Sequence, residues 1–287
     1  MNYRTLLFIP GNNPGMLLNS DILGADGVII DLEDAVQINE KDTGRLLVKE
    51  YLETFTERTT DVFVRINPLD SPYFYDDLDA IKDLDIQGIV LPKSCIESMT
   101  ALDKYLKENS LDLDVIALLE TAIGIEEARD VAIASDQVIG LFLGAEDLTL
   151  DLGAIRTKES EEIAYARARI ITAAKSAGIQ AIDTPFTDTD DIEGLIKDTH
   201  NAKGLGMTGK TAISPRHVSE INKAFSPSEA DINYAFRVID GVKEANEKGL
   251  GAFSIDGKMI DRPIILRALN TLKLSGNYEE EYDELLK

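Results

Sequence analysis

The chain has 287 residues, 44% of them hydrophobic, which is enough for one sizeable hydrophobic core. Its 52 acidic and 29 basic residues give a net charge of −23, which argues against nucleic acid as a partner. No apolar run reaches the ~18 residues of a membrane span, and the single cysteine, Cys95, excludes an internal disulfide. We therefore expect a cytoplasmic protein that binds neither membrane nor nucleic acid.

Short apolar segments alternate with longer amphipathic segments over the first 224 residues, as in repeated strand–helix units around a parallel sheet. The expected strands are 5–9, 28–32, 62–66, 88–91, 115–119, 138–143, 180–182 and 211–213. The expected helices are 14–23, 40–56, 75–84, 96–108, 124–135, 159–177, 188–203 and 217–224. Eight units predict an α/β fold, a (β/α)8 TIM barrel, with a doubly wound open sheet as the alternative.

The regular alternation ends after residue 224. A helix over 230–248, a glycine-rich stretch at 249–251 and a last helix over 264–274 are expected beyond it. We expect residues 225–287 to be a helical extension of the same domain as residues 1–224, serving as a lid or as an arm to a neighbouring subunit.

Acidic residues follow two successive predicted strands in the middle of the chain. The strand at 115–119 leads into Glu120, and the next strand leads to Glu146 and Asp147. Barrel enzymes keep their chemistry at the carboxyl ends of the strands, where Glu120 and Asp147 would meet. Two carboxylates, with the other positions left to water or substrate, are a usual way to hold Mg²⁺. The sequence therefore predicts a magnesium site, although either acid could instead cap the helix that follows it.

Other predicted strand ends also present polar groups. Glu33, Asp34 and Glu146 could be additional metal ligands or could support the ligands. The turn that begins at Pro10 and Gly11 could offer backbone amides to an anion.

Arg65 follows the third predicted strand. Its planar guanidinium could bind a carboxylate or an oxyanion with two donors, or could form a structural ion pair with one of the acids. His200 and His217 are expected to be solvated, so zinc is not expected.

The segment GLGMTGKT at 204–211 satisfies the phosphate-loop pattern G-x-x-x-x-G-K-[ST]. That motif needs a strand before it and a helix after it, whereas here a helical stretch precedes it and a short strand follows. An ordinary helix-to-strand turn explains the glycines better. A P-loop nucleotide hydrolase remains the alternative of another class, and a catalytically silent scaffold subunit is a third possibility.

Several motifs occur in the order of one known family. They are LFIPGN (7–12), DLEDAV (31–36), VRIN (64–67), LGAED (143–147), AGIQAIDT (177–184), LGMTGK (205–210) and GKMID (257–261). With these motifs the chain resembles the β subunit of citrate lyase and the citramalyl-CoA and malyl-CoA lyases of the HpcH/HpaI aldolase/citrate lyase superfamily. Leu148 stands where citrate lyase β subunits often carry an aromatic residue, a departure that favours the stand-alone lyases.

The resemblance implies Mg²⁺-dependent carbon–carbon cleavage of a citryl or citramalyl thioester, bound to CoA or to an acyl carrier. The products would be an acetyl thioester and an α-keto acid, oxaloacetate or pyruvate; malyl-CoA lyase or malate synthase-like activity is the near alternative. The resemblance also implies a homotrimer or larger assembly, with citrate lyase α and acyl-carrier subunits as possible partners.

The family's site residues carry over to matching positions of this chain. Glu120 and Asp147 would bind Mg²⁺, Arg65 would lie beside the thioester enolate, and Asp261 would act as acid or base from a neighbouring subunit's arm. The remaining candidates for substrate binding are Pro10, Gly11, Glu33, Asp34, Ala145 and Glu146.

Overall fold

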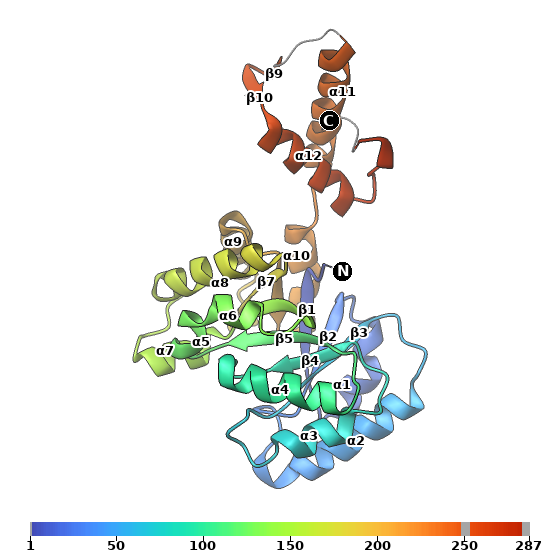
Figure 1. The fold of residues 1–287 in the computed structure, drawn as a ribbon, viewed down its shortest axis with the longest axis vertical. Coiled ribbons are helices and arrows are strands. Elements are labelled where there is room, and N and C mark those ends of the chain that lie inside the picture. The colour runs from blue at the N-terminus through green and yellow to red at the C-terminus, as the bar shows by residue number, and fades with distance from the viewer. Residues whose placement is uncertain (1, 248–252, 283–287) are drawn as a thin grey trace. The chain divides into compact units, whose positions relative to one another are not determined.

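The computed structural model describes residues 2–247 and 253–282, and its contacts divide the chain into two compact units, Met1–Asn222 and Lys223–Lys287. The first unit contains a closed barrel of eight parallel strands in sequence order (Figure 1). The strands are β1 (Thr5–Pro10), β2 (Gly27–Asp31), β3 (Asp61–Arg65), β4 (Gly88–Leu91), β5 (Asp114–Leu119), β6 (Val138–Leu143), β7 (Gln180–Asp183) and β8 (Gly209–Ala212). Pairing of β1 with β8 closes the sheet, which confirms the predicted TIM barrel and excludes the open sheet.

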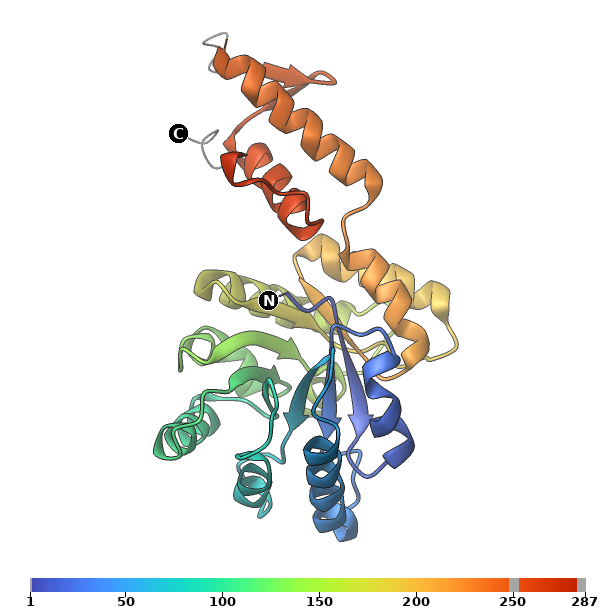
Figure 2. The ribbon, with the colours of Figure 1, turned by 90° about the vertical axis from the view of Figure 1, so that its right-hand side faces the viewer.

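Helices lie around the outside of the barrel (Figure 2). They are α1 (Pro14–Asn19), α2 (Lys41–Thr54), α3 (Phe74–Ile81), α4 (Ile96–Glu108), α5 (Ala122–Glu126), α6 (Ala128–Ala132), α7 (Ala145–Leu152), α8 (Ala164–Ala177), α9 (Ile192–Leu205) and α10 (Pro215–Phe225). Single 3₁₀ turns occupy Ser20–Ile22, Ile38–Glu40 and Glu161–Ile163.

Two helical assignments differ from the sequence expectation. The helix expected at 124–135 is broken into α5 and α6 at Glu127, whose ψ of 2° departs from helical geometry. The helix α7 is not expected from the sequence, because its eight residues follow a strand almost directly and are too few to show a clear period.

Apolar side chains from alternate strand positions fill the barrel. The buried cluster consists of Tyr3, Leu6, Ile29, Phe63, Val90, Ile116, Leu118, Phe142 and Ile182. The rings of Tyr3 and Phe63 pack edge to face, with their centroids 5.3 Å apart. The barrel is thus a packed core, and a ligand must bind at one end of it.

The strand register brings particular residues together at that end. Asp31 pairs with Arg65 across β2 and β3, and Leu119 pairs with Leu143 across β5 and β6. The residue after Leu119 is Glu120, so the first residues beyond β5 and β6 are neighbours.

The second unit has its own small core. It contains α11 (Glu229–Glu247), a hairpin of β9 (Phe253–Ile255) and β10 (Lys258–Ile260), and α12 (Arg262–Leu274). The core residues are Ala235, Val238, Ile239, Ile260, Ala268, Leu269, Leu272 and Tyr282. The hairpin is not in the sequence expectation, although its turn residues Asp256 and Gly257, with φ of 50° and 75°, form a typical hairpin pair.

The unit boundary lies two residues before the one expected at 224 and 225. The stretch expected at 249–251 lies outside the described residues. The role of this unit as a lid or intersubunit arm stays a prediction.

Candidate active site

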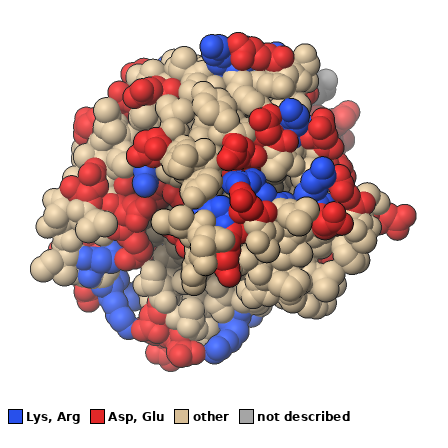
Figure 3. Space-filling model, turned by 90° about the horizontal axis from the view of Figure 1, so that it is seen from below, with Lys and Arg blue, Asp and Glu red and all other residues tan. Residues whose placement is uncertain are grey.

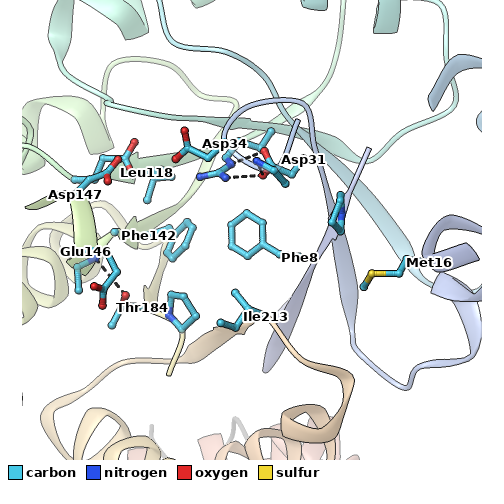
Figure 4. A pocket seen from close by; sticks show the side chains of 17 residues that line it. Phe8, Met16, Asp31, Asp34, Leu118, Phe142, Glu146, Asp147, Thr184 and Ile213 are labelled. Atoms are coloured by element: carbon cyan, nitrogen blue, oxygen red, sulfur yellow. Dashed lines mark hydrogen bonds and ion pairs between the residues drawn. The ribbon is translucent and has the colours of Figure 1, made fainter. Parts of the chain in front are cut away.

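A cavity of about 430 Å³ lies in the first unit, where the strands end. The blue strand arrows of Figure 2 point downward, and the view from below in Figure 3 shows more acidic than basic side chains. The cavity is lined by Phe8, Pro10, Met16, Asp31, Asp34, Ala35, Arg65, Leu118, Glu120, Phe142, Gly144, Ala145, Glu146, Asp147, Thr184, Pro185 and Ile213. The lining therefore combines apolar side chains with five carboxylates and one guanidinium (Figure 4).

Glu120 follows β5 directly and is only 3% exposed. Its Oε1 accepts a hydrogen bond from the Lys93 backbone amide at 2.8 Å. Gly144 leaves room for the other oxygen, because a Cβ on this residue would lie 2.7 Å from Glu120 Oε2. Among the described residues no donor reaches Oε2, so this oxygen is available to a ligand.

Burial raises the pKa of Glu120 to about 7, and the negative charge of Asp147 adds to this rise. The Lys93 amide and the Arg65 guanidinium act in the opposite direction. A cation placed between Glu120 and Asp147 would offset the repulsion between them.

Asp147 and Glu146 lie in the first turn of α7, not in the strand. The start of α7 is fixed by Thr184, whose Oγ1 accepts a hydrogen bond from the Ala145 amide at 3.2 Å. Figure 4 shows this bond beside Glu146, with Asp147 farther along the same wall. Within the described part of the chain, the Asp147 carboxylate accepts no hydrogen bond.

Arg65 is held on several sides. Its Nε and Nη2 donate to the two oxygens of Asp31 at 2.7 and 2.6 Å, and its guanidinium lies 4.9 Å from the centre of the Phe8 ring. Its Nη1 lies 3.1 Å from Glu33 Oε2. Burial lowers the pKa of Arg65, but the charges of Asp31, Glu33 and Glu120 outweigh burial and leave it raised. The guanidinium is therefore always charged.

Asp31 is a site residue that the sequence analysis did not single out. Besides the two bonds from Arg65, its carboxylate accepts hydrogen bonds from the amides of Glu33 and Ala35 at 2.9 and 3.0 Å. Four donors leave Asp31 no capacity for a metal ion, so its role is to orient Arg65. Its place at the end of β2, directly across from Arg65, was a usable signal.

Two of the predicted substrate-binding residues do not line the cavity. Gly11 is buried, and its amide donates to the Asp31 carbonyl at 2.8 Å, so this amide is not free to bind an anion. Glu33 is 4% exposed and faces Arg65 instead; burial raises its pKa to about 8. Pro10, Asp34, Ala145 and Glu146 do line the cavity.

One expectation for the histidines is wrong. His200 is exposed, but His217 is fully buried, with its Nε2 3.3 Å from the Thr189 carbonyl. Its position at the start of an amphipathic helix directs it inward. Neither histidine lines the cavity, so the anionic side chains that could bind a metal ion there are all carboxylates.

The glycine-rich segment at 204–211 is not a phosphate loop. Leu205 ends α9, Gly206 caps that helix with φ of 118°, and β8 follows. Lys210 is fully buried, and its Nζ donates to Asp183 and Asp198 at 2.6 Å each. This lysine cannot reach a bound nucleotide without breaking both contacts.

Asp261 belongs to the second unit, where it caps α12. Its Oδ1 accepts a hydrogen bond from the Ile264 amide at 3.2 Å, and the residue is exposed. Its role as a catalytic acid or base stays a prediction.

The cavity donors fit Mg²⁺ better than a transition metal. No cluster of three acidic, histidine or cysteine side chains that could hold a metal ion occurs among the described residues. Glu120 and Asp147 are two carboxylates with free oxygen atoms on one wall, and Mg²⁺ commonly takes one or two carboxylates and fills its other positions with water or substrate.

The model of the HpcH/HpaI aldolase/citrate lyase family matches residues 4–215. The chain belongs to this family. Citrate lyase subunit beta of Leuconostoc mesenteroides subsp. cremoris is 40% identical, over 97% of this chain and 98% of its own length. Human mitochondrial citramalyl-CoA lyase is 33% identical, over 97% of this chain and 87% of its own. The family resemblance seen in the sequence is thereby confirmed.

A solved structure of a family member gives the same fold with ligands. It is the CitE protein of Mycobacterium tuberculosis in complex with magnesium, acetoacetate and coenzyme A, with a TM-score of 0.81 and 30% identity over 96% of this chain and 98% of that one. No helix within the described residues is long and apolar enough to cross a membrane.

Proposed function

We propose that this protein is a Mg²⁺-dependent lyase that cleaves a citryl or citramalyl thioester of coenzyme A to an acetyl thioester and an α-keto acid. The observation that carries the proposal is that Glu120 and Asp147 line the same cavity as Arg65, with Asp147 near enough for its charge to act on Glu120. The names of the family members and the magnesium and coenzyme A in the CitE complex support it.

The reaction breaks the bond between the carbinol carbon and the α-carbon of the thioester. The hydroxyl proton leaves, the carbinol oxygen becomes a ketone, and the electrons of the broken bond pass to the thioester as an enolate. The enolate then takes a proton and becomes the acetyl thioester. Bound Mg²⁺ would supply Lewis-acid stabilisation of negative charge on the oxygen that becomes the ketone. Glu120 and Asp147 would hold that ion.

Arg65 would stabilise the enolate. Its guanidinium is locked by Asp31 and Phe8, so it needs no reorganisation as charge develops. Nη1 does not contact Asp31; one of its two N–H groups faces Glu33, and the other can meet an oxyanion. By analogy with a lost oxyanion-hole donor, this interaction lowers the barrier by about 3–4 kcal/mol.

Asp261 would act as the acid or base that transfers a proton in this reaction. This residue would come from the second unit of a neighbouring copy of the chain. A site that needs two copies implies an oligomer, and the family resemblance favours a homotrimer or a larger assembly. The acyl group is carried by coenzyme A or by an acyl carrier subunit, with a citrate lyase α subunit as a further partner. The cytoplasm is the proposed location.

The direct test is incubation of the purified protein with citryl-CoA, citramalyl-CoA and malyl-CoA plus Mg²⁺, with release of keto acid as the measurement. We expect cleavage of citryl-CoA or citramalyl-CoA that EDTA abolishes and Mg²⁺ restores. Cleavage of malyl-CoA alone would favour the malyl-CoA lyase alternative, and no cleavage of any thioester would contradict the proposal.

A further inference from the structure

The two proposed substrates differ in one group. Cleavage of a citryl thioester releases oxaloacetate, which carries a second carboxylate on the carbon that is the methyl group of the pyruvate released from a citramalyl thioester. A carboxylate that leaves water must meet a cation or several donors, whereas a methyl group needs only an apolar surface. The cations near the cavity therefore decide between the substrates.

The lining of the cavity contains only one cation among the described residues, Arg65. This guanidinium is already shared between Asp31 and Glu33. The other charged groups of the lining are acidic, and the proposed Mg²⁺ would be used at the reacting end of the substrate. A second substrate carboxylate would therefore need a further cation within reach.

Arg156 is not a lining residue but contacts one, and it belongs to the segment between α7 and α8. Its Nε lies 3.2 Å from Oε1 of Glu146, a cavity residue whose side chain is 53% exposed. Arg156 is itself 20% exposed at its side chain, and its Nη2 makes no hydrogen bond to any described residue. The guanidinium thus retains donors for a ligand.

The opposite side of Arg156 is anchored. Its Nη1 donates to Oε1 of Glu162 at 2.6 Å, to the Thr157 carbonyl at 2.7 Å and to Ser160 Oγ at 3.1 Å. Ser160 is buried with φ of 60°, a conformation that its surroundings must stabilise. The loop therefore holds Arg156 in one place, while its contact to the exposed Glu146 is weak.

We propose that Arg156 binds the second carboxylate of the substrate in place of Glu146, and so selects thioesters that release a dicarboxylic keto acid. Exchange of one carboxylate for another at a solvent-exposed ion pair costs little. This inference rests on the proposed function, and it deepens that function by assigning citryl rather than citramalyl thioester as the preferred substrate.

The test compares the Arg156→Gln variant with the wild type in two assays. Titration calorimetry with Mg²⁺ measures the binding of oxaloacetate and of pyruvate, and steady-state assays measure kcat/KM for citryl-CoA and citramalyl-CoA. We expect the affinity for oxaloacetate and kcat/KM for citryl-CoA to fall roughly 10- to 100-fold in the variant, as for a lost charge-assisted hydrogen bond. The affinity for pyruvate and kcat/KM for citramalyl-CoA should fall less than about threefold. An Arg156→Lys variant should recover part of the loss, because it keeps the charge.

Lys158→Gln is the matched control. Lys158 lies in the same loop and forms exposed ion pairs with Asp188 and Asp191 at 2.9 Å, but it does not contact Glu146. We expect this variant to keep the wild-type preference. Equal losses for both substrates in Arg156→Gln, or a wild type that prefers citramalyl-CoA and pyruvate, would overturn the assignment.

The proposed function and this inference fail separately. If neither thioester is cleaved, the lyase proposal is wrong, but calorimetry still decides whether Arg156 distinguishes oxaloacetate from pyruvate. If both thioesters are cleaved and Arg156→Gln leaves their ratio unchanged, the lyase proposal stands and the assignment of Arg156 is wrong.

Discussion

Gly144 lies so close to Glu120 that the two residues act as one feature of the site. A Cβ on Gly144 would lie 2.6 Å from Glu120 Cβ and 2.9 Å from Leu118 Cδ1. Glycine therefore determines where the Glu120 carboxylate lies, because any other residue would push it away from Asp147.

For this reason we expect Gly144→Ala to weaken Mg²⁺ binding at least about tenfold, the loss typical when a neighbour that orients a metal ligand is changed. Calorimetric titration with Mg²⁺ measures the effect. Gly140→Ala is the matched control in β6, the strand that leads to Gly144, because a Cβ on Gly140 would meet its nearest atom at 3.4 Å, an ordinary contact. Equal Mg²⁺ affinity in both variants would show that Gly144 does not position a ligand.

Sequence reasoning located the acids and the arginine of the cavity but not their partners. Glu120, Asp147 and Arg65 end or follow apolar strands, and that pattern is visible in the chain. Burial of Glu33 and of the Gly11 amide could not be foreseen, because these depend on packing between segments that are distant in sequence. The catalytic roles themselves stay predictions.

Secondary elements around β7 and β8 are joined by a fully buried charge cluster. Arg167 of α8 donates to Asp183 of β7 and to Asp198 of α9, at 2.8 to 2.9 Å. Lys210 of β8 donates to the same two acids. Two cations and two anions balance one another, and they tie two helices to two strands.

We expect Asp198→Asn to lower the free energy of unfolding by about 3–5 kcal/mol, because it leaves buried cations without their partner. Burial raises the pKa of Asp198, but Lys210 and Arg167 outweigh burial and leave this pKa below its ordinary value. Its contribution to stability is then complete above the unfolded-state pKa of about 3.9 and is lost as pH falls through the lower folded-state pKa.

Urea unfolding at several pH values measures both effects. The wild type should lose stability below about pH 4 more steeply than Asp198→Asn. Asp190→Asn is the control, because Asp190 forms an exposed pair with Arg216 and should change stability by less than about 1 kcal/mol. A similar decrease in the free energy of unfolding in the two variants would show that the buried cluster contributes no more to stability than an exposed ion pair.

Among the secondary-structure elements, the eight strands and most helices were predicted correctly from apolar periodicity. The helix α7 and the break at Glu127 did not, since both segments are short. The segment at 204–211 shows that a matching motif can also mislead. It has the residues of a phosphate loop, but here a helix precedes the motif and a strand follows, so Lys210 lies in the buried charge cluster.

Two properties of the whole molecule, the closure of the barrel and the association of several copies, are not encoded in any local sequence pattern. Closure depends on β1 meeting β8 across the full sheet, and no local pattern encodes this; the count of eight units was the only guide. The second unit has a buried core of its own, but the sequence suggests its partner only through the family resemblance.

If Asp261 acts in the active site of a neighbouring copy, two inactive variants should recover lyase activity when they assemble together. We expect Glu120→Gln and Asp261→Asn each to lose nearly all lyase activity. Co-expressed in equal amounts, they should recover about a quarter of wild-type activity, because some sites then combine an intact barrel with an intact arm. Absence of recovery in assemblies shown by native mass spectrometry to be mixed would contradict a shared site.

We infer that Glu120 and Asp147 together hold one magnesium ion at the mouth of the barrel. A crystal structure grown with Mg²⁺ and oxaloacetate tests it most directly. We predict a single ion with one oxygen of Glu120 and one of Asp147 at about 2.1 Å, and with oxaloacetate completing its coordination. An ion bound by other residues, or these two carboxylates turned away from each other with no ion between them, would contradict the account.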